Sequence, residues 1–93
     1  MTTTEKMSHS SLGKRLEAKL AKKYAASSTF HERFGNQDIT YLSDEQGLAI
    51  QLYIGKRNAD GNILGERFSR RMVKDASGKI IKSHWDRMGK IGV

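Results

Sequence analysis

Cysteine is absent from the 93-residue chain, which excludes disulfide bonds and thiolate chemistry. The three histidines, His9, His31 and His84, are spread along the chain without the close paired spacing of metal ligands, so we expect no metal site. Neither G-x-x-x-x-G-K nor G-x-G-x-x-G occurs, and we therefore expect no phosphate-cradling loop and no cofactor.

Long apolar runs are missing too. No stretch approaches the roughly 18–20 apolar residues of a membrane span. The first six residues have no apolar segment behind their charges, so they do not resemble a secretory signal. With the lack of cysteine, this favours a cytoplasmic protein without membrane partners.

Positive charge is abundant and unevenly distributed. The formal net charge is +7, with an isoelectric point near 9.9. Residues 1–29 and 62–93 are strongly basic, whereas residues 30–61 carry more acidic than basic side chains. Such asymmetry bears on partners rather than on fold, and it favours acidic macromolecules such as nucleic acid.

One turn signature occurs three times, with Asp or Asn first and Gly fourth. Its copies are Asp44–Gly47, Asn58–Gly61 and Asp75–Gly78. This pattern is typical of a type I turn followed by a left-handed glycine. Because apolar residues follow each copy, the pattern predicts antiparallel hairpins. A fourth copy, Asp86–Gly89, either ends the last predicted strand or opens a short fifth one.

We therefore predict an α+β fold in which an N-terminal amphipathic helix packs on a four-stranded antiparallel β-meander. Residues 1–9 should form a disordered arm, and residues 10–93 a single small domain. Leucines at four-residue spacing predict the helix within residues 10–24. The predicted strands cover residues 38–43, 48–57, 62–74 and 79–86. Residues 29–34 fit either a helical turn, which we favour, or a short strand.

Three-residue loops at the turns would place even-numbered side chains on the helix-covered face of the sheet. These include Leu42, Ile50, Leu52, Ile54, Leu64, Phe68 and Met72. The opposite face would then interleave aromatic and arginine side chains, which suits base stacking and phosphate contacts. The candidate nucleic-acid-binding residues are Tyr41, Tyr53, Arg67, Arg71, Trp85 and Arg87. A two-residue loop at Ser77–Gly78 would instead move Trp85 into the core.

The sequence thus favours non-enzymatic binding of an anionic partner, with single-stranded nucleic acid first. A protein-interaction module or homodimer using the same face, with Val73 and Ile81 exposed, is one alternative. A small cysteine-free ribonuclease is another. In it, His84 would face Arg70 near Glu66 and Asp86 and act on an RNA 2′-hydroxyl, although the same residues suit an ordinary cross-strand charge lattice.

Overall fold

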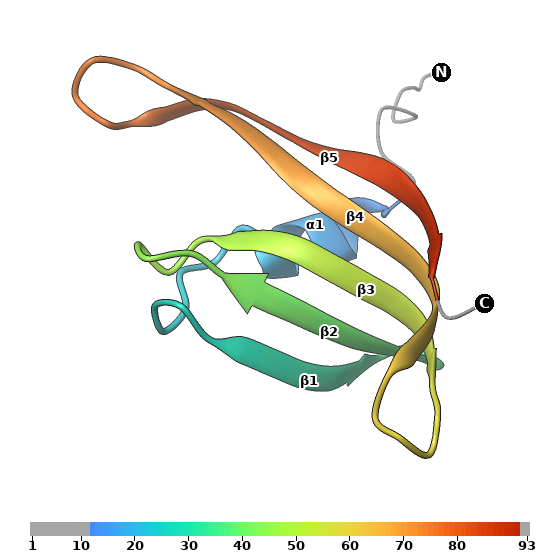
Figure 1. Cartoon of the computed structure of the whole chain (residues 1–93). Helices are drawn as coiled ribbons and strands as arrows, with labels where there is room; N and C mark the ends of the chain where they lie inside the picture. The colour runs from blue at the N-terminus through green and yellow to red at the C-terminus, as the bar shows by residue number, and fades with distance from the viewer. Residues whose placement is uncertain (1–11, 92–93) are drawn as a thin grey trace, which may run out of the picture.

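The computed structural model describes residues 12–91 and contains one short helix and one antiparallel sheet (Figure 1). The elements are α1 (Lys14–Leu20), β1 (Thr29–Phe34), β2 (Gln37–Ser43), β3 (Ala49–Arg57), β4 (Ile63–Lys74) and β5 (Ile80–Ile91). The five strands lie in chain order across the sheet. The predicted α+β class is confirmed, but the sheet has five strands rather than four. The arm predicted for residues 1–9 lies outside the described residues.

The additional strand is β1, where we had favoured a helical turn. Phe30, Glu32 and Phe34 point to the helix-covered face, and Phe30 pairs with Tyr41 across β1 and β2. Their rings stack with centroids 5.1 Å apart. The helical-turn prediction was wrong because strand pairing and this aromatic packing outweigh a local capping pattern.

Helix α1 is shorter than the leucine spacing suggests. It spans seven residues, and Ala21 forms its C-terminal cap. Leu16 and Leu20 are almost fully buried, as predicted, whereas Leu12 and Tyr24 flank the helix and pack on the core from outside it. Tyr24 instead donates its backbone N–H to the Gly47 carbonyl oxygen at 2.8 Å. The chain after the helix is thereby tied to the β2–β3 turn.

All three predicted turns form with the same geometry. The first residue of each donates its backbone N–H to the carbonyl of the fifth, and the glycine N–H returns to the first carbonyl. The side-chain oxygen of each Asp or Asn accepts two further backbone N–H groups. The three turn glycines have φ of 82°, 87° and 89°, which confirms their left-handed conformation.

Register departs from the prediction in the β2–β3 and β4–β5 pairs, whereas the β3–β4 pair keeps the predicted register. Ile50, Ile81 and Met88 each have no partner in the strand pairing, because a β-bulge interrupts the ladder there. A bulge adds one residue to one strand, so beyond it the pairing is shifted by one residue. Side chains that the unbulged register places on opposite faces of the sheet then lie on the same face. Tyr41 therefore lies opposite Leu52, and Trp85 lies opposite Arg70. The Met88 bulge lies inside β5, so the fourth turn signature does not form a hairpin.

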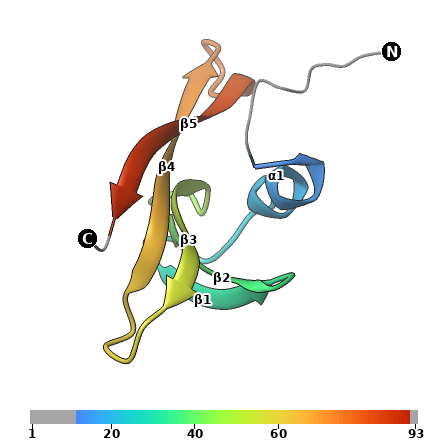
Figure 2. The ribbon, with the colours of Figure 1, turned by 90° about the vertical axis from the view of Figure 1, so that its right-hand side faces the viewer.

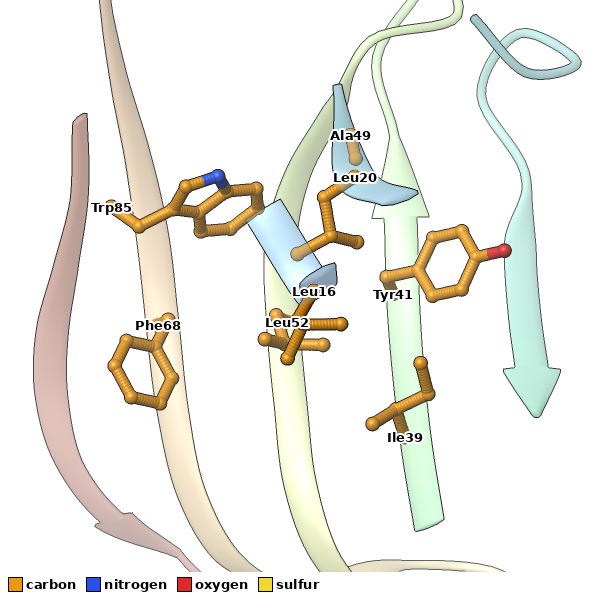
Figure 3. Close-up of a cluster of buried hydrophobic side chains, with 8 residues drawn as sticks. All are labelled: Leu16, Leu20, Ile39, Tyr41, Ala49, Leu52, Phe68 and Trp85. Carbon is orange, nitrogen blue, oxygen red and sulfur yellow. The ribbon is translucent and has the colours of Figure 1, made fainter. Parts of the chain in front are cut away.

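The core lies between α1 and the inner face of the sheet, which curves around the helix (Figure 2). Leu16 and Leu20 meet residues from β2 to β5 there (Figure 3). The buried members are Leu16, Leu20, Ile39, Tyr41, Ala49, Leu52, Phe68 and Trp85. Of the side chains predicted to be inward, Leu52 and Phe68 are buried, whereas Leu42 lies on the outer face and Leu64 is 41% exposed.

Polar links join the helix to the sheet beside this core. Lys19 Nζ lies 2.5 Å from Glu32 Oε1, and the Tyr41 hydroxyl donates to Glu32 Oε2 at 2.6 Å. These contacts lower the pKa of Glu32, chiefly through Lys19. Burial, with help from Glu32, raises the pKa of Tyr41. Within residues 12–91, no helix has the length and apolarity needed to cross a membrane.

Candidate nucleic-acid interface

The structure divides the six predicted binding residues between the two faces of the sheet. Tyr53, Arg67 and Arg71 lie on the outer face, which is turned away from α1. Tyr41 is fully buried, and Trp85 is only 6% exposed. Placing these two rings on an exposed platform was wrong, because the bulges at Ile50 and Ile81 turn them inward.

Arg87 also lies on the inner side, opposite Phe68. Its guanidinium pairs with the Glu66 carboxylate near the open edge of the sheet. The side chain remains more than half exposed. Arg87 therefore belongs to a surface ion pair on the opposite side of the sheet from Tyr53.

Tyr53 and Arg67 form the centre of the outer face. They are directly paired across β3 and β4, and both side chains are half-buried. The Tyr53 hydroxyl donates to Gln51 Oε1 at 3.0 Å, which holds the ring over the sheet. Within the described residues, the Arg67 side chain has no carboxylate or other hydrogen-bond partner. A free guanidinium thus lies next to an ordered aromatic ring.

A second guanidinium reaches the other side of Tyr53. Arg57 Nη1 donates to Thr40 Oγ1 at 3.0 Å, and Thr40 is the cross-strand partner of Tyr53. The same nitrogen lies 3.2 Å from His31 Nδ1, and Nη2 donates to the Ile39 carbonyl oxygen at 3.0 Å. The order across the outer face is therefore His31, Arg57 with Thr40, Tyr53 and Arg67. We call this row the outer-face stripe.

Three members of the stripe, His31, Thr40 and Arg57, are not among the residues predicted from the sequence. Arg57 follows Tyr53 by four residues in one strand, so simple alternation already placed it on the same face. His31 could not be placed, because residues 29–34 were interpreted as a helical turn. Its position depends on the pairing of β1 with β2.

Asp38 binds the backbone of Arg57 at one end of the outer-face stripe, but it makes no ion pair with the Arg57 guanidinium. Its Oδ2 accepts the backbone N–H of Arg57 at 2.9 Å, and this hydrogen bond is the main cause of its lowered pKa. Its other oxygen lies 3.8 Å from Arg33 Nη1. Among the described residues, the groups that contact the Arg57 guanidinium itself include no carboxylate.

Arg71 takes part in a separate cluster near the β4–β5 hairpin. Asp86 Oδ1 lies 3.1 Å from both Arg71 Nη2 and His84 Nε2. The predicted pairing of His84 with Arg70 was wrong, because the bulge places Arg71 opposite His84 and Arg70 on the inner face with Trp85. The side chains of Arg71, His84 and Asp86 are 70%, 42% and 36% exposed, which suits a solvated cross-strand ion cluster.

The outer face can attract an anion and stack a planar ring, but it shows no built metal site. Within residues 12–91, no three His, Asp or Glu side chains gather closely enough to hold a metal ion. Val73 and Ile81, named for the interaction-module alternative, are 47% and 57% exposed on the distal part of the β4–β5 hairpin. Comparison of the chain with protein-family models, curated proteins and solved structures gives no match.

Proposed function

We propose that the protein binds single-stranded nucleic acid, without cleaving it, through the outer-face stripe. The observation that carries this proposal is the placement of Tyr53 between the guanidinium groups of Arg57 and Arg67. A base has a flat face that can stack on Tyr53, and a neighbouring phosphate can accept hydrogen bonds from Arg67.

The charge distribution supports the same choice of partner. Arg67 has no acidic partner among the described residues, so a phosphate would meet a cation that is not already neutralised. Two further cations on the same face, Lys82 and Arg71, lie along β4 and β5 toward the hairpin, and of these Arg71 is paired with Asp86. A strand of phosphates could follow them away from Tyr53.

A binding titration tests the proposal. We expect a labelled single-stranded oligonucleotide to bind at about 50 mM salt, where electrostatic attraction is strong. The logarithm of the association constant should fall with the logarithm of salt concentration by about 0.7 per phosphate neutralised. Arg67→Gln should weaken binding and flatten this slope by roughly one contact.

Lys22→Gln is the matched control. It removes one positive charge from an exposed position after α1, away from the outer face. We expect it to change affinity much less than Arg67→Gln does. Equal effects of the two substitutions would indicate general attraction to a basic protein, and a larger effect of Lys22→Gln would move the site to the helix region.

A further inference from the structure

A depression of about 440 Å³ adjoins Tyr53 on the outer face. Its lining combines apolar side chains with hydroxyl, amide and imidazole groups, as is usual for small-ligand sites. The lining residues are His31, Thr40, Tyr53, Gly61, Asn62, Ile63 and Ile91. Residues from all five strands and from the β3–β4 turn therefore meet at one place.

Arg57 links the strand residues that line the depression to the β3–β4 turn. Its Nη1 contacts His31 and Thr40 on one side and donates to the Gly61 carbonyl oxygen at 3.1 Å on the other. Asn58 also fixes the turn, because its Oδ1 accepts the backbone N–H groups of Asp60 and Asn62 at 3.0 Å. The β3–β4 turn and the strand residues that line the depression are thus held in position before any ligand binds.

The hydrogen bonds within the protein leave groups of His31 and Asn62 available to contact a ligand. His31 Nδ1 lies 2.9 Å from Thr40 Oγ1 and 3.2 Å from Arg57 Nη1, so its hydrogen-bonding capacity is used within the protein, whereas His31 Nε2 has no partner among the described residues. The Asn62 side-chain amide makes no hydrogen bond to the residues described by the structure. A ligand can therefore meet one ring nitrogen from His31 and both a donor and an acceptor from Asn62.

These groups match a nucleobase better than a phosphate. The Arg57 guanidinium already donates to protein acceptors, and the lining residues include no lysine or arginine. A base needs an apolar or aromatic surface for its faces and mixed donors and acceptors for its edge. Tyr53 and Ile63 supply the surface, and Asn62 supplies the mixed edge.

We infer that this depression is a subsite for one unstacked base, read at its edge by His31 and Asn62, while Arg67 holds the adjacent phosphate. The inference rests on the proposed binding of single-stranded nucleic acid and adds where a base is recognised. It assigns sequence preference to His31 in β1 and to Asn62 in the β3–β4 turn, rather than to the basic strands β4 and β5.

The test compares a short single-stranded DNA with an abasic DNA of equal length, which keeps the phosphates and lacks the bases. Wild-type protein should bind the normal strand roughly five- to hundredfold more tightly, the range expected for one stacked base. Asn62→Trp should fill the depression and remove most of this difference in affinity between the two strands. The matched control, Asn36→Trp in the exposed β1–β2 turn, should retain the difference.

NMR of the wild-type protein provides a readout that does not depend on a variant folding. On addition of the normal strand, the His31 ring and Asn62 side-chain signals should shift, whereas the abasic strand should shift Arg67 without them. Equal binding of both strands, or an unchanged difference in a folded Asn62→Trp protein, would overturn the base subsite while leaving nucleic-acid binding intact. Failure of both strands to bind would overturn the subsite and the proposed function together.

Discussion

Arg70 lies opposite Trp85 across β4 and β5, and its guanidinium carbon is 5.9 Å from the centre of the indole ring. The same guanidinium donates to the Ala49 carbonyl oxygen at 3.1 Å, so it covers the edge of the core between β3 and β5. Burial lowers the pKa of Arg70, but a guanidinium remains charged at every ordinary pH. Trp85 is consequently enclosed by the helix, the sheet and a cation.

This enclosure predicts that Trp85 contributes to stability rather than to ligand stacking. Trp85→Ala should lower the free energy of unfolding by about 3–5 kcal/mol, because it empties a large buried volume. Met88→Ala is the control, since Met88 is 51% exposed and should change stability by less than about 0.5 kcal/mol. Urea denaturation followed by circular dichroism measures both. A loss below about 1 kcal/mol for Trp85→Ala would mean that the ring is not in the core.

The turn glycines offer a matched pair. Gly61→Ala should cost about 1 kcal/mol, because φ is 87° but a Cβ would meet open space. Gly47→Ala should cost clearly more, since its Cβ would lie 2.2 Å from the Tyr24 carbonyl oxygen. Chemical denaturation of the two variants gives the comparison. Equal losses would show that Tyr24 does not pack against this turn.

The Glu32 links predict a pH effect on stability. A lowered pKa in the folded state means that Glu32 stabilises the fold above the ordinary value of 4.5, and that this contribution disappears as the pH falls through the lowered value. Because the pair is partly exposed, Glu32→Gln should cost only about 0.5–1 kcal/mol at pH 7. Thermal unfolding should show the two proteins converging in acid, with Glu45→Gln as the exposed control. A constant difference down to pH 2 would contradict the role of the charge.

Local signals predicted much of this fold. The repeated Asx-x-x-Gly turns gave the hairpins, the strand order from β2 to β5 and the pairing next to each turn. They could not reveal the bulges, because Leu48, Ile50, Leu52 and Ile54 alternate without a break, yet Ile50 is left unpaired. Ala49 is instead fully buried in the core beneath α1, a packing that depends on tertiary contacts.

In the candidate site, too, local sequence patterns placed some residues correctly, whereas others depend on bulges and strand pairing. Tyr53, Arg67 and Arg71 were placed on the outer face, because β3 and the adjoining half of β4 keep their register from the Asn58 turn. Tyr41 and Trp85 were misplaced because each lies beyond a bulge. The role of His31 emerges only from the pairing of β1, and that of Arg57 from its reach to Thr40.

An NMR titration of the protein with short single-stranded RNA and DNA at about 50 mM salt tests the central claim most directly. Side-chain signals separate the two faces, because Tyr53 and Arg67 lie on the outer face and Trp85 on the inner one. The Tyr53 ring and Arg67 Nε–H signals should shift progressively, while the Trp85 indole N–H should remain in place. No shift at all, or shifts concentrated on α1 and residues 21–23, would contradict binding at the outer-face stripe.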